Sequence, residues 1–426
     1  MNAPRAELER LQLEKINALL SEIVPKNPFQ TERLQQAGIK IPLKDLMEFR
    51  AKVPFTTKAE IAEDHRQHPP YGTNLTYPPS RYTRYNQTSA TTGEPLRWLD
   101  TAEDWEWMVG NWRRVFEAAG VGPEDRVYFA FSFGPFLGFW LGFEAAERIG
   151  CLCLPGGGLT SAARLMAILD NEVTVLCCTP TYAIRLGQVA SEEKIDLSRS
   201  KVRALIVAGE PGASVPATRR RIESIWPDSN VYDHHGMTEV GPVSYECPRR
   251  RGVLHVMEDA YCAEVVDSAS GEPISAGRVG ELVLTPLGRF GSPLLRYRTS
   301  DLVQAVQPLP CACGSVEMAL VGGILGRADD MVFIRGVNLY PGAVENLLRE
   351  FEEVAEYRVE IREERSMTEL AVIVEPTPEA SGDGRLAKRL EHSFRTAFNL
   401  RVPVTLAEPG SLPRFEMKAR RWVRRE

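Results

Sequence analysis

The sequence lacks a long apolar run and lacks an excess of basic residues. Its longest uncharged stretch, residues 127–143, is interrupted by glycines and a proline and falls short of a bilayer span. Residues 1–24 carry charges throughout, without the apolar core and small-residue cleavage site of a secretion signal. With 51 Lys and Arg against 57 Asp and Glu, the net charge of −6 argues against nucleic acid as a partner. We therefore expect a cytoplasmic protein that binds neither membranes nor nucleic acids.

Disulfide bonds are not expected either. The chain has eight cysteines in 426 residues and no export signal, so reduced thiols are the expectation. Four of them fall in apolar, strand-like runs and are predicted to be core residues: Cys151, Cys153, Cys177 and Cys178. No internal repeat is visible. The length is too great for one compact core, which indicates two or three domains.

Helices and short strands alternate through the middle of the chain. An amphipathic helix is predicted over residues 6–23, and Thr101 with Asp104 resembles a capping box ahead of a second helix that ends before Gly120. The pattern that follows is typical of a largely parallel sheet covered by helices. The expected strands are 127–131, 151–154, 173–178 and 202–207, and the expected helices are 137–149, 162–169 and 183–190.

The C-terminal part of the chain has a different pattern. Shorter strands separated by turns are predicted at 263–266, 281–284 and 302–305, which indicates a β-rich subdomain over about 241–325. A final α+β unit is expected, with strands at 331–334, 357–361 and 370–374 and helices at 344–351 and 384–397. The predicted fold class is therefore α/β. A large N-terminal domain, residues 1–328, would be joined by a hinge to a small domain, residues 329–426.

The segment Tyr85–Pro95, Y-N-Q-T-S-A-T-T-G-E-P, is rich in hydroxyl side chains. The N–H groups of a tight turn, with Ser and Thr hydroxyls beside them, can surround phosphate oxygens. Ordinary solvated turns have the same composition, so the loop alone does not decide. The candidate phosphate-binding residues are Thr88, Ser89, Thr91, Thr92 and Gly93.

Further motifs follow this loop in a fixed order. They are Ala208–Pro211 (A-G-E-P), His235–Glu239 (H-G-M-T-E), Arg296–Asp301 (R-Y-R-T-S-D), Gly326–Asp330 (G-R-A-D-D) and Leu412–Arg414 (L-P-R), ahead of Lys418. In order and spacing, this set resembles the AMP-forming adenylating enzymes, the superfamily of acyl-CoA synthetases, luciferases and peptide-synthetase adenylation domains. Within it, the chain looks most like the phenylacetate-CoA ligase family, through Val53–Lys58, Cys178–Ala183 and Ile334–Pro341.

The resemblance implies an ATP- and Mg²⁺-dependent ligase. Such enzymes convert a carboxylic acid, here an aromatic or heteroaromatic one, to an acyl-adenylate and pyrophosphate, and then transfer the acyl group to coenzyme A with release of AMP. A homodimer is suggested by the resemblance alone. Transfer of the acyl group to a carrier-protein thiol or to an amine stays open. So does a non-catalytic descendant that only binds a nucleotide or acid, since Ala90, Glu94 and Ser300 stand where relatives commonly have Gly, Lys and Gly.

The resemblance also implies catalytic roles for single residues. Lys418 would bridge the carboxylate and the α-phosphate, which suits a compact cation with rotatable donors. Glu239 would hold Mg²⁺, because this cation takes one or two carboxylates beside phosphate oxygens. Arg327 would lie near the ribose and phosphate, and Asp329 would be the hinge.

The nucleotide's ribose and base are assigned in the same way. Asp301 would accept hydrogen bonds from both ribose hydroxyls with its two oxygens. Gly209 and Glu210 would form the adenine-side loop, and His235 would stack on the base, with Gly236 and Thr238 in the same motif. For the acid pocket, Phe131, Phe133 and Phe136 are candidates because rings pack on an aryl acid, with core packing as the alternative. Ala208 and His234 are further candidates for substrate contact.

Four side chains outside these motifs form a candidate metal site. Cys247 and His255 are separated by seven residues, and Cys311 and Cys313 by one alanine within P-C-A-C-G. Three thiols and an imidazole make a closed Cys₃His set, as in structural zinc sites. The spacing is looser than a standard finger, so unrelated free thiols are the alternative. Relatives in the phenylacetate-CoA ligase family often show a similar pattern, which favours a zinc ion that stabilises the β-rich subdomain.

Overall fold

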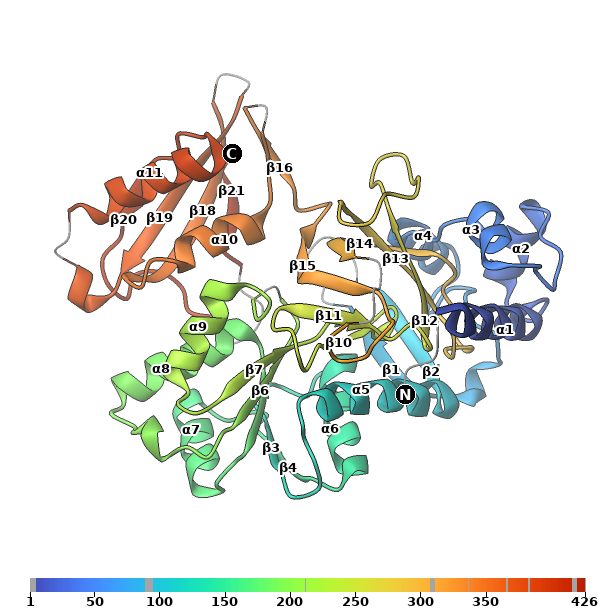
Figure 1. Cartoon of the computed structure of the whole chain (residues 1–426), viewed down its shortest axis with the longest axis horizontal. Helices are drawn as coiled ribbons and strands as arrows, with labels where there is room; N and C mark the ends of the chain where they lie inside the picture. Colours follow the sequence, from blue (N-terminus) through green and yellow to red (C-terminus); the bar gives the residue numbers. More distant parts are fainter. Residues whose placement is uncertain are drawn as a thin grey trace.

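The computed structural model of the protein describes residues 5–88, 95–210, 212–306, 311–335, 337–364, 367–381, 384–415 and 420–425 (Figure 1). Its strands form a five-stranded, a six-stranded and a four-stranded sheet, together with two-stranded pairs. Among the described residues, no helix is both long enough and apolar enough to cross a bilayer. The predicted α/β class is confirmed.

The five-stranded sheet is parallel, as the alternation of helices and strands predicts. Its order is β4-β3-β5-β6-β7, with β3 Arg126–Phe129, β4 Leu152–Pro155, β5 Val175–Cys178, β6 Ala204–Val207 and β7 Asn230–Asp233. Side chains of alternate residues enter two cores, because successive side chains of a strand point to opposite faces. One face packs on α5 (Ala102–Ala118) and α6 (Leu137–Ile149), and the other packs on α7 (Ser161–Asp170), α8 (Pro180–Glu192) and α9 (Pro216–Ile225).

Helices α1 to α4 form the N-terminal end of the chain, at the right of Figure 1. They are α1 Arg5–Ile23, α2 Pro28–Gln36, α3 Leu46–Lys52 and α4 Lys58–Gln67, and a separate small core joins the first three to the antiparallel sheet. The hairpin β1 (Tyr82–Gln87) and β2 (Arg97–Thr101) then leads into α5. Both bonds of the predicted Thr101–Asp104 capping box are present.

The six-stranded sheet is antiparallel, with the order β10-β11-β15-β14-β13-β12. Its strands are β10 Ser244–Glu246, β11 Val253–Val256, β12 Tyr261–Val266, β13 Val279–Pro286, β14 Tyr297–Val306 and β15 Ala319–Arg327. The prediction of shorter strands here was wrong. β13 and β14 continue past polar residues because Arg298 pairs with Glu281 across the ladder, so these charges do not end the strands.

The C-terminal unit has its own sheet and core and lies above α8 and α9 in Figure 1. Its sheet order is β20-β19-β18-β21, with β18 Val354–Glu364, β19 Met367–Pro376, β20 Val404–Leu406 and β21 Trp422–Arg425, packed on α10 (Pro341–Arg349) and α11 (Leu386–Phe398). The small pairs are β8 Gly236–Met237 with β9 Gly241–Pro242, and β16 Val332–Ile334 with β17 Val337–Leu339. The domain boundary at residues 328 and 329 stays a prediction.

The strand cysteines largely match their prediction. Cys177 and Cys178 are buried in the parallel sheet and Cys151 is buried beside it, while Cys153, on the edge strand β4, is only half-buried. The core prediction was therefore wrong in degree for Cys153, because an edge strand has no neighbour on one side to cover it.

Candidate active site

Predicted site residues gather at the carboxyl ends of the parallel strands. Phe131 and Phe133 follow β3, Ala208 follows β6, and His234 and His235 follow β7. Open parallel sheets bind ligands at this edge, because the loops leaving neighbouring strands converge there. The structure thus brings together segments that lie far apart in the sequence.

The loop after β6 contains a backbone conformation that favours glycine. Gly209 has a φ of 94°, a conformation that L side chains rarely adopt. The carboxylate of Glu210 accepts a hydrogen bond from the N–H of Thr181 at 2.8 Å, in the first turn of α8. Glu210 therefore ties this loop to the start of α8, and Ala208 beside it is half-buried.

His234 is buried and neutral. Its ring packs edge-on against Trp112 with the centroids 4.3 Å apart, and neither ring nitrogen has a hydrogen-bond partner among the described residues. Burial, followed by the neighbouring His235, lowers the pKa of His234 to about 3. The preceding Asp233 shows the opposite shift, since burial raises its pKa to about 6 despite the hydrogen bonds from Ser214.

Asp301 lies between His235 and Arg327. His235 Nε2 is 2.9 Å from Asp301 Oδ2, and Arg327 Nη1 is 3.4 Å from Asp301 Oδ1. The ladder between β14 and β15 places Asp301 directly opposite Arg327, and the Ser244 hydroxyl accepts the backbone N–H of His235 at 3.0 Å. A buried carboxylate needs such partners to offset the hydration that it loses. Arg327 also binds both oxygens of Asp329, at 2.8 and 2.7 Å, so the predicted hinge residue is held by the same guanidinium.

Ser300 shows why a glycine is expected beside Asp301. Its φ is 63°, in the left-handed region that glycine adopts without steric cost. The Ser300 N–H donates to Glu281 at 3.0 Å, which holds the backbone in this conformation. The departure from the family pattern therefore changes the local strain and leaves Asp301 in place.

Glu239 stands in a tight turn between β8 and β9. Gly236 opens that hairpin, and a Cβ there would lie 3.0 Å from the carbonyl oxygen of Gly241, so the close pairing requires a glycine. The Glu239 carboxylate is nearly buried and lies 3.3 Å from Lys58 Nζ, which is half exposed at the start of α4. Burial and the charge of Glu239 raise the pKa of the neighbouring Tyr297 well above its ordinary value.

The segment predicted to bind phosphate, Tyr85–Pro95, is described only in part. Thr88 is buried, and it closes the base of the loop: its N–H donates to the Leu96 carbonyl at 2.9 Å and its hydroxyl accepts from the Leu96 N–H at 3.0 Å. The other predicted phosphate ligands, Ser89, Thr91, Thr92 and Gly93, lie outside the described residues, as do Ala90 and Glu94. Lys418 is outside them too.

The aromatic residues after β3 form one cluster with α6. Phe131 stacks on Phe139 with the centroids 4.0 Å apart, and Phe133 contacts Phe131 and Trp140 edge-on at 5.6 and 4.9 Å. Phe136 occupies the N-cap position of α6 without a capping side-chain hydrogen bond, and its ring centroid lies 6.0 Å from that of Phe139. The N–H of Gln87, just before the phosphate loop, donates to the Pro135 carbonyl at 2.8 Å. The aromatic segment therefore lies against the strand that leads into this loop.

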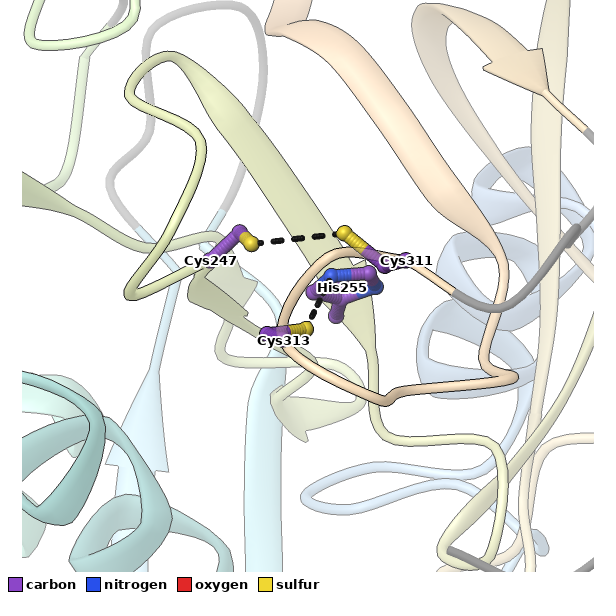
Figure 2. A group of neighbouring side chains, drawn as sticks. All are labelled: Cys247, His255, Cys311 and Cys313. Carbon is purple, nitrogen blue, oxygen red and sulfur yellow. Dashed lines mark hydrogen bonds between the residues drawn. The ribbon is translucent and has the colours of Figure 1, made fainter.

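The four predicted zinc ligands meet in space, as Figure 2 shows. Cys247 Sγ is 3.6 Å from Cys311 Sγ, and Cys313 Sγ is 3.4 Å from His255 Nε2. All four ligand atoms lie within 4.8 Å of one another. Cys311 and Cys313 stand on a turn in which Gly314, with a φ of 85°, donates to the Cys311 carbonyl at 2.7 Å, while Cys247 and His255 come from the β10–β11 hairpin.

Two contacts of this site were not predicted from the sequence. Lys58 belongs to a motif that carries the family resemblance, yet no role was assigned to it, and the structure places it at Glu239. Thr181 likewise belongs to a family motif, and its backbone N–H donates a hydrogen bond to the Glu210 carboxylate. Their presence in the motifs was the available signal, but their partners come from distant parts of the chain.

Known proteins resemble this chain over almost its whole length. Residues 50–286 match the family model of the AMP-binding enzymes, and residues 336–425 match that of the AMP-binding enzyme C-terminal domain. The phenylacetate-coenzyme A ligase of Thermus thermophilus is 31% identical over 97% of this chain and 95% of its own. The chain belongs to the AMP-binding enzyme family.

Within this family the relatives at about 30% identity are CoA ligases. The phenylacetate-coenzyme A ligase of Escherichia coli is 29% identical over 97% of this chain and 94% of its own. The predictions of the family and of an AMP-forming CoA ligase are thereby confirmed, with ATP, coenzyme A and a small-molecule acid as its substrates.

Structures of one relative in different states allow the domain arrangement to be compared. A 2-hydroxyisobutyryl-CoA ligase in the postadenylation state, with 2-HIB-AMP, is 29% identical and superposes with a TM-score of 0.94 over 100% of this chain and 91% of that one. The same enzyme with 2-HIB-AMP and CoA in the thioesterification state gives 0.75, at 30% identity over 99% and 91%. The present arrangement of this AMP-binding enzyme is therefore nearer to the first state.

Proposed function

We propose that this CoA ligase activates an aromatic or heteroaromatic carboxylic acid. The observation that carries the proposal is the cluster of Phe131, Phe133 and Phe136 at the carboxyl end of β3, held against the strand before the phosphate loop. Aromatic rings favour an aryl ligand through apolar burial and edge-to-face contact. The phenylacetate-coenzyme A ligase name of the relatives supports the same substrate class.

The charged residues fit the first half-reaction. Forming an acyl-adenylate brings a carboxylate and a triphosphate together, so positive charge must compensate two anions in the transition state. In our proposal Lys418 bridges the two, Arg327 supports the α-phosphate and ribose, and the loop from Thr88 to Gly93 donates to the outer phosphates. Asp301 accepts the ribose hydroxyls, while His235 and the Gly209–Glu210 loop border the adenine.

Glu239 fits a magnesium ligand by its surroundings. Its carboxylate is nearly buried and already has one cation, Lys58, at 3.3 Å, so this position stabilises positive charge. Mg²⁺ bound to phosphate oxygens commonly takes one or two protein carboxylates as further ligands. When bound, Mg²⁺ would neutralise part of the charge on the β- and γ-phosphates.

The hinge role of Asp329 belongs to the second half-reaction. Arg327 holds Asp329 in the arrangement seen here. The two TM-scores against one relative, 0.94 and 0.75, support a change of domain arrangement between its two states. In our proposal, this chain makes the same change about Asp329 before coenzyme A reacts.

We also propose that the Cys₃His cluster binds structural zinc. Tetrahedral Zn–S and Zn–N bonds imply ligand separations of about 3.8 Å for two sulfurs and about 3.6 Å for sulfur and nitrogen. The 3.6 Å and 3.4 Å separations here are close to those values. Because four protein ligands complete the coordination, the ion would join the β10–β11 hairpin to the turn before β15 without taking part in the reaction.

Acid-dependent ATP–pyrophosphate exchange tests the substrate class. The panel contains phenylacetate, benzoate, nicotinate, 2-hydroxyisobutyrate and acetate, each at the same concentration with Mg²⁺ and ATP. We expect exchange with at least one aryl acid at a kcat/KM at least tenfold above both aliphatic acids. A preference for 2-hydroxyisobutyrate or acetate would contradict the aromatic pocket and leave the ligase class intact.

A further inference from the structure

Arg289 and Asp100 form an ion pair with no exposed surface on either side chain. Arg289 Nε donates to Asp100 Oδ1 at 2.6 Å, and Arg289 Nη1 donates to two carbonyl oxygens, of Thr238 at 2.9 Å and of Glu239 at 2.7 Å. The guanidinium therefore holds the backbone of the residue proposed to bind Mg²⁺. Neither Asp100 nor Arg289 belongs to a motif of the family resemblance.

Asp100, the other member of the pair, lies on the hairpin that flanks the predicted phosphate loop. Asp100 lies on β2, and its second oxygen is 3.4 Å from Asn86 Nδ2 on β1. β1 and β2 are the paired strands on either side of the loop, with Asn86 opposite Trp98 in register. Arg289 also packs over the ring of Trp98 at 5.4 Å. One buried guanidinium thus contacts both the hairpin of the phosphate loop and the Thr238–Glu239 turn.

The segment around Arg289 is fixed on both sides. A Cβ at Gly288 would lie 2.3 Å from Trp107 Nε1, and one at Gly291 would lie 2.3 Å from Asp104 Oδ2, so both glycines allow close packing on α5. The N–H groups of Phe290 and Gly291 donate to Asp104, and Ser292 donates to the Leu99 carbonyl at 2.6 Å. The backbone on both sides of Arg289 is therefore fixed, and this fixes the point from which its side chain extends to the Thr238–Glu239 turn.

Stability alone does not account for this pair. A buried ion pair is often no more stabilising than an apolar pair of similar volume, because both charges lose their hydration. The planar guanidinium offers several donors in a fixed fork, which Lys or an apolar side chain cannot reproduce. The contacts of Arg289 depend on that fork, because Nε donates to Asp100 while Nη1 donates to the consecutive carbonyls of Thr238 and Glu239.

We propose that Arg289 is a positioning residue that fixes the backbone of Thr238 and Glu239 relative to the β1–β2 hairpin. The inference rests on the proposed role of Glu239 at Mg²⁺. Because Asp100 compensates the charge of Arg289, the effect is on geometry rather than on the local field. The pair sets the distance between the metal-binding carboxylate and the phosphate loop, and so the affinity for MgATP.

The test replaces the pair without leaving a lone buried charge. The double variant Asp100→Leu with Arg289→Met replaces both charges by apolar side chains of similar volume. Arg289→Lys keeps the positive charge but loses the planar guanidinium and its several donors. Partners that orient metal ligands typically affect metal affinity by about 10- to 100-fold. We expect the double variant to raise the KM for MgATP and the half-saturating free Mg²⁺ at least tenfold, with the KM for the acid within twofold of wild type. Arg289→Lys should lie between the two.

A matched control uses an ion pair at the opposite end of the parallel sheet. Arg203 binds Asp125 just before β3, away from the site, and its side chain is partly exposed. Arg203→Met removes an ion pair of the same two residue types and should leave both constants within twofold. Wild-type MgATP and Mg²⁺ constants in both Arg289 variants would overturn the inference. If the double variant does not fold, Arg289→Lys decides alone, since a purely charge-compensating role predicts wild-type constants for it. Failure of wild-type enzyme to exchange with any acid would instead contradict the proposed function.

Discussion

The two ends of strand β15 hold polar clusters of opposite chemistry. At its start, Ala319 pairs with His255, where three thiols and an imidazole face one another. At its end, Arg327 pairs with Asp301, where carboxylates meet a guanidinium and an imidazole. The first set consists of three soft sulfur donors and an imidazole, which is the donor set expected of a closed zinc site, whereas the second consists of oxygen and nitrogen groups that hydrogen-bond to one another.

This contrast indicates that one end of β15 contributes to folding and the other end to substrate binding. A metal whose coordination is filled by protein contributes to folding, while groups that bind substrate must exchange partners during turnover. We therefore expect changes at the thiol end to alter the melting temperature with little effect on kinetic constants. Substitution of groups proposed to bind substrate should do the reverse. The predictions for Lys418, Cys311 and Asp301 test this separation, and the prediction for His234 tests a separate effect of burial on stability.

The largest effect is expected from Lys418→Ala. Loss of a donor that stabilises transition-state charge typically lowers kcat by about 10²- to 10³-fold. Acid-dependent ATP–pyrophosphate exchange should fall by at least that much, with the melting temperature within 2 °C (about 1 kcal/mol) of wild type. Lys388→Ala on α11 serves as the control for loss of a basic side chain. Exchange that survives in Lys418→Ala would show that Lys418 is not the bridging lysine.

Cys311→Ser should destabilise the thiol end. Structural zinc contributes directly to folding, so loss of a ligand should cost several kcal/mol and lower the melting temperature by roughly 10 °C. Differential scanning fluorimetry gives the melting temperature, and metal analysis should find about one zinc per wild-type chain and less in the variant. Cys177→Ser, in the parallel sheet, controls for loss of a buried thiol without metal loss. Zinc-free wild-type protein, or an unchanged melting temperature in Cys311→Ser, would contradict the metal centre.

His234, buried against Trp112 beside His235, should make the stability of the fold sensitive to acid. Its pKa in the folded protein is about 3, against an ordinary value of about 6.5, because burial excludes the charged form. The unfolded chain binds a proton as the pH falls through 6.5 and the folded chain does not, so stability falls between pH 6.5 and 3. At pH 5 this amounts to about 2 kcal/mol.

The measurement is urea unfolding of wild type and His234→Leu at pH 7.5 and pH 5. The wild-type free energy of unfolding should fall by about 2 kcal/mol more than that of the variant over this interval. Asp233 contributes an opposite slope, since its raised pKa favours the folded state at low pH, but it is present in both proteins and cancels in the difference. Equal slopes in the two proteins would show that His234 is not excluded from protonation.

Asp301→Asn should have the smallest effect of the set. It keeps the shape but removes the charge that orients His235 and Arg327, and one of two acceptors for the ribose. We expect the KM for ATP to rise about tenfold, close to the value of one hydrogen bond to a charged group. Steady-state kinetics with 2′-deoxy-ATP sharpens the result: the variant should discriminate less between the two nucleotides than wild type does. A fall in melting temperature with unchanged KM would assign Asp301 to folding instead.

Local signals in the sequence predicted much of the fold. The Thr101–Asp104 capping box and the helix at 137–149 depend on neighbours within a few residues, and both are confirmed. The lengths of β13 and β14 were underestimated because the Arg298–Glu281 pair that keeps their charges inside the sheet forms between two strands.

The site was predicted through ordered motifs, and its long-range contacts were not. Asp301 and His235 could be named from their motifs, and their roles stay predictions until tested. The Asp100–Arg289 pair joins residues 189 positions apart, and neither belongs to a motif that carries the family resemblance. Only the packed structure shows that Arg289 reaches the backbone of Glu239.

Product analysis with phenylacetate, ATP, Mg²⁺ and coenzyme A tests the central claim most directly. Chromatography with mass detection should find phenylacetyl-CoA and AMP formed in equal amounts, with pyrophosphate, and none of them when the acid is omitted. Formation of ADP with phosphate, or consumption of ATP without any aryl thioester across the aryl acids, would contradict an AMP-forming aryl-CoA ligase.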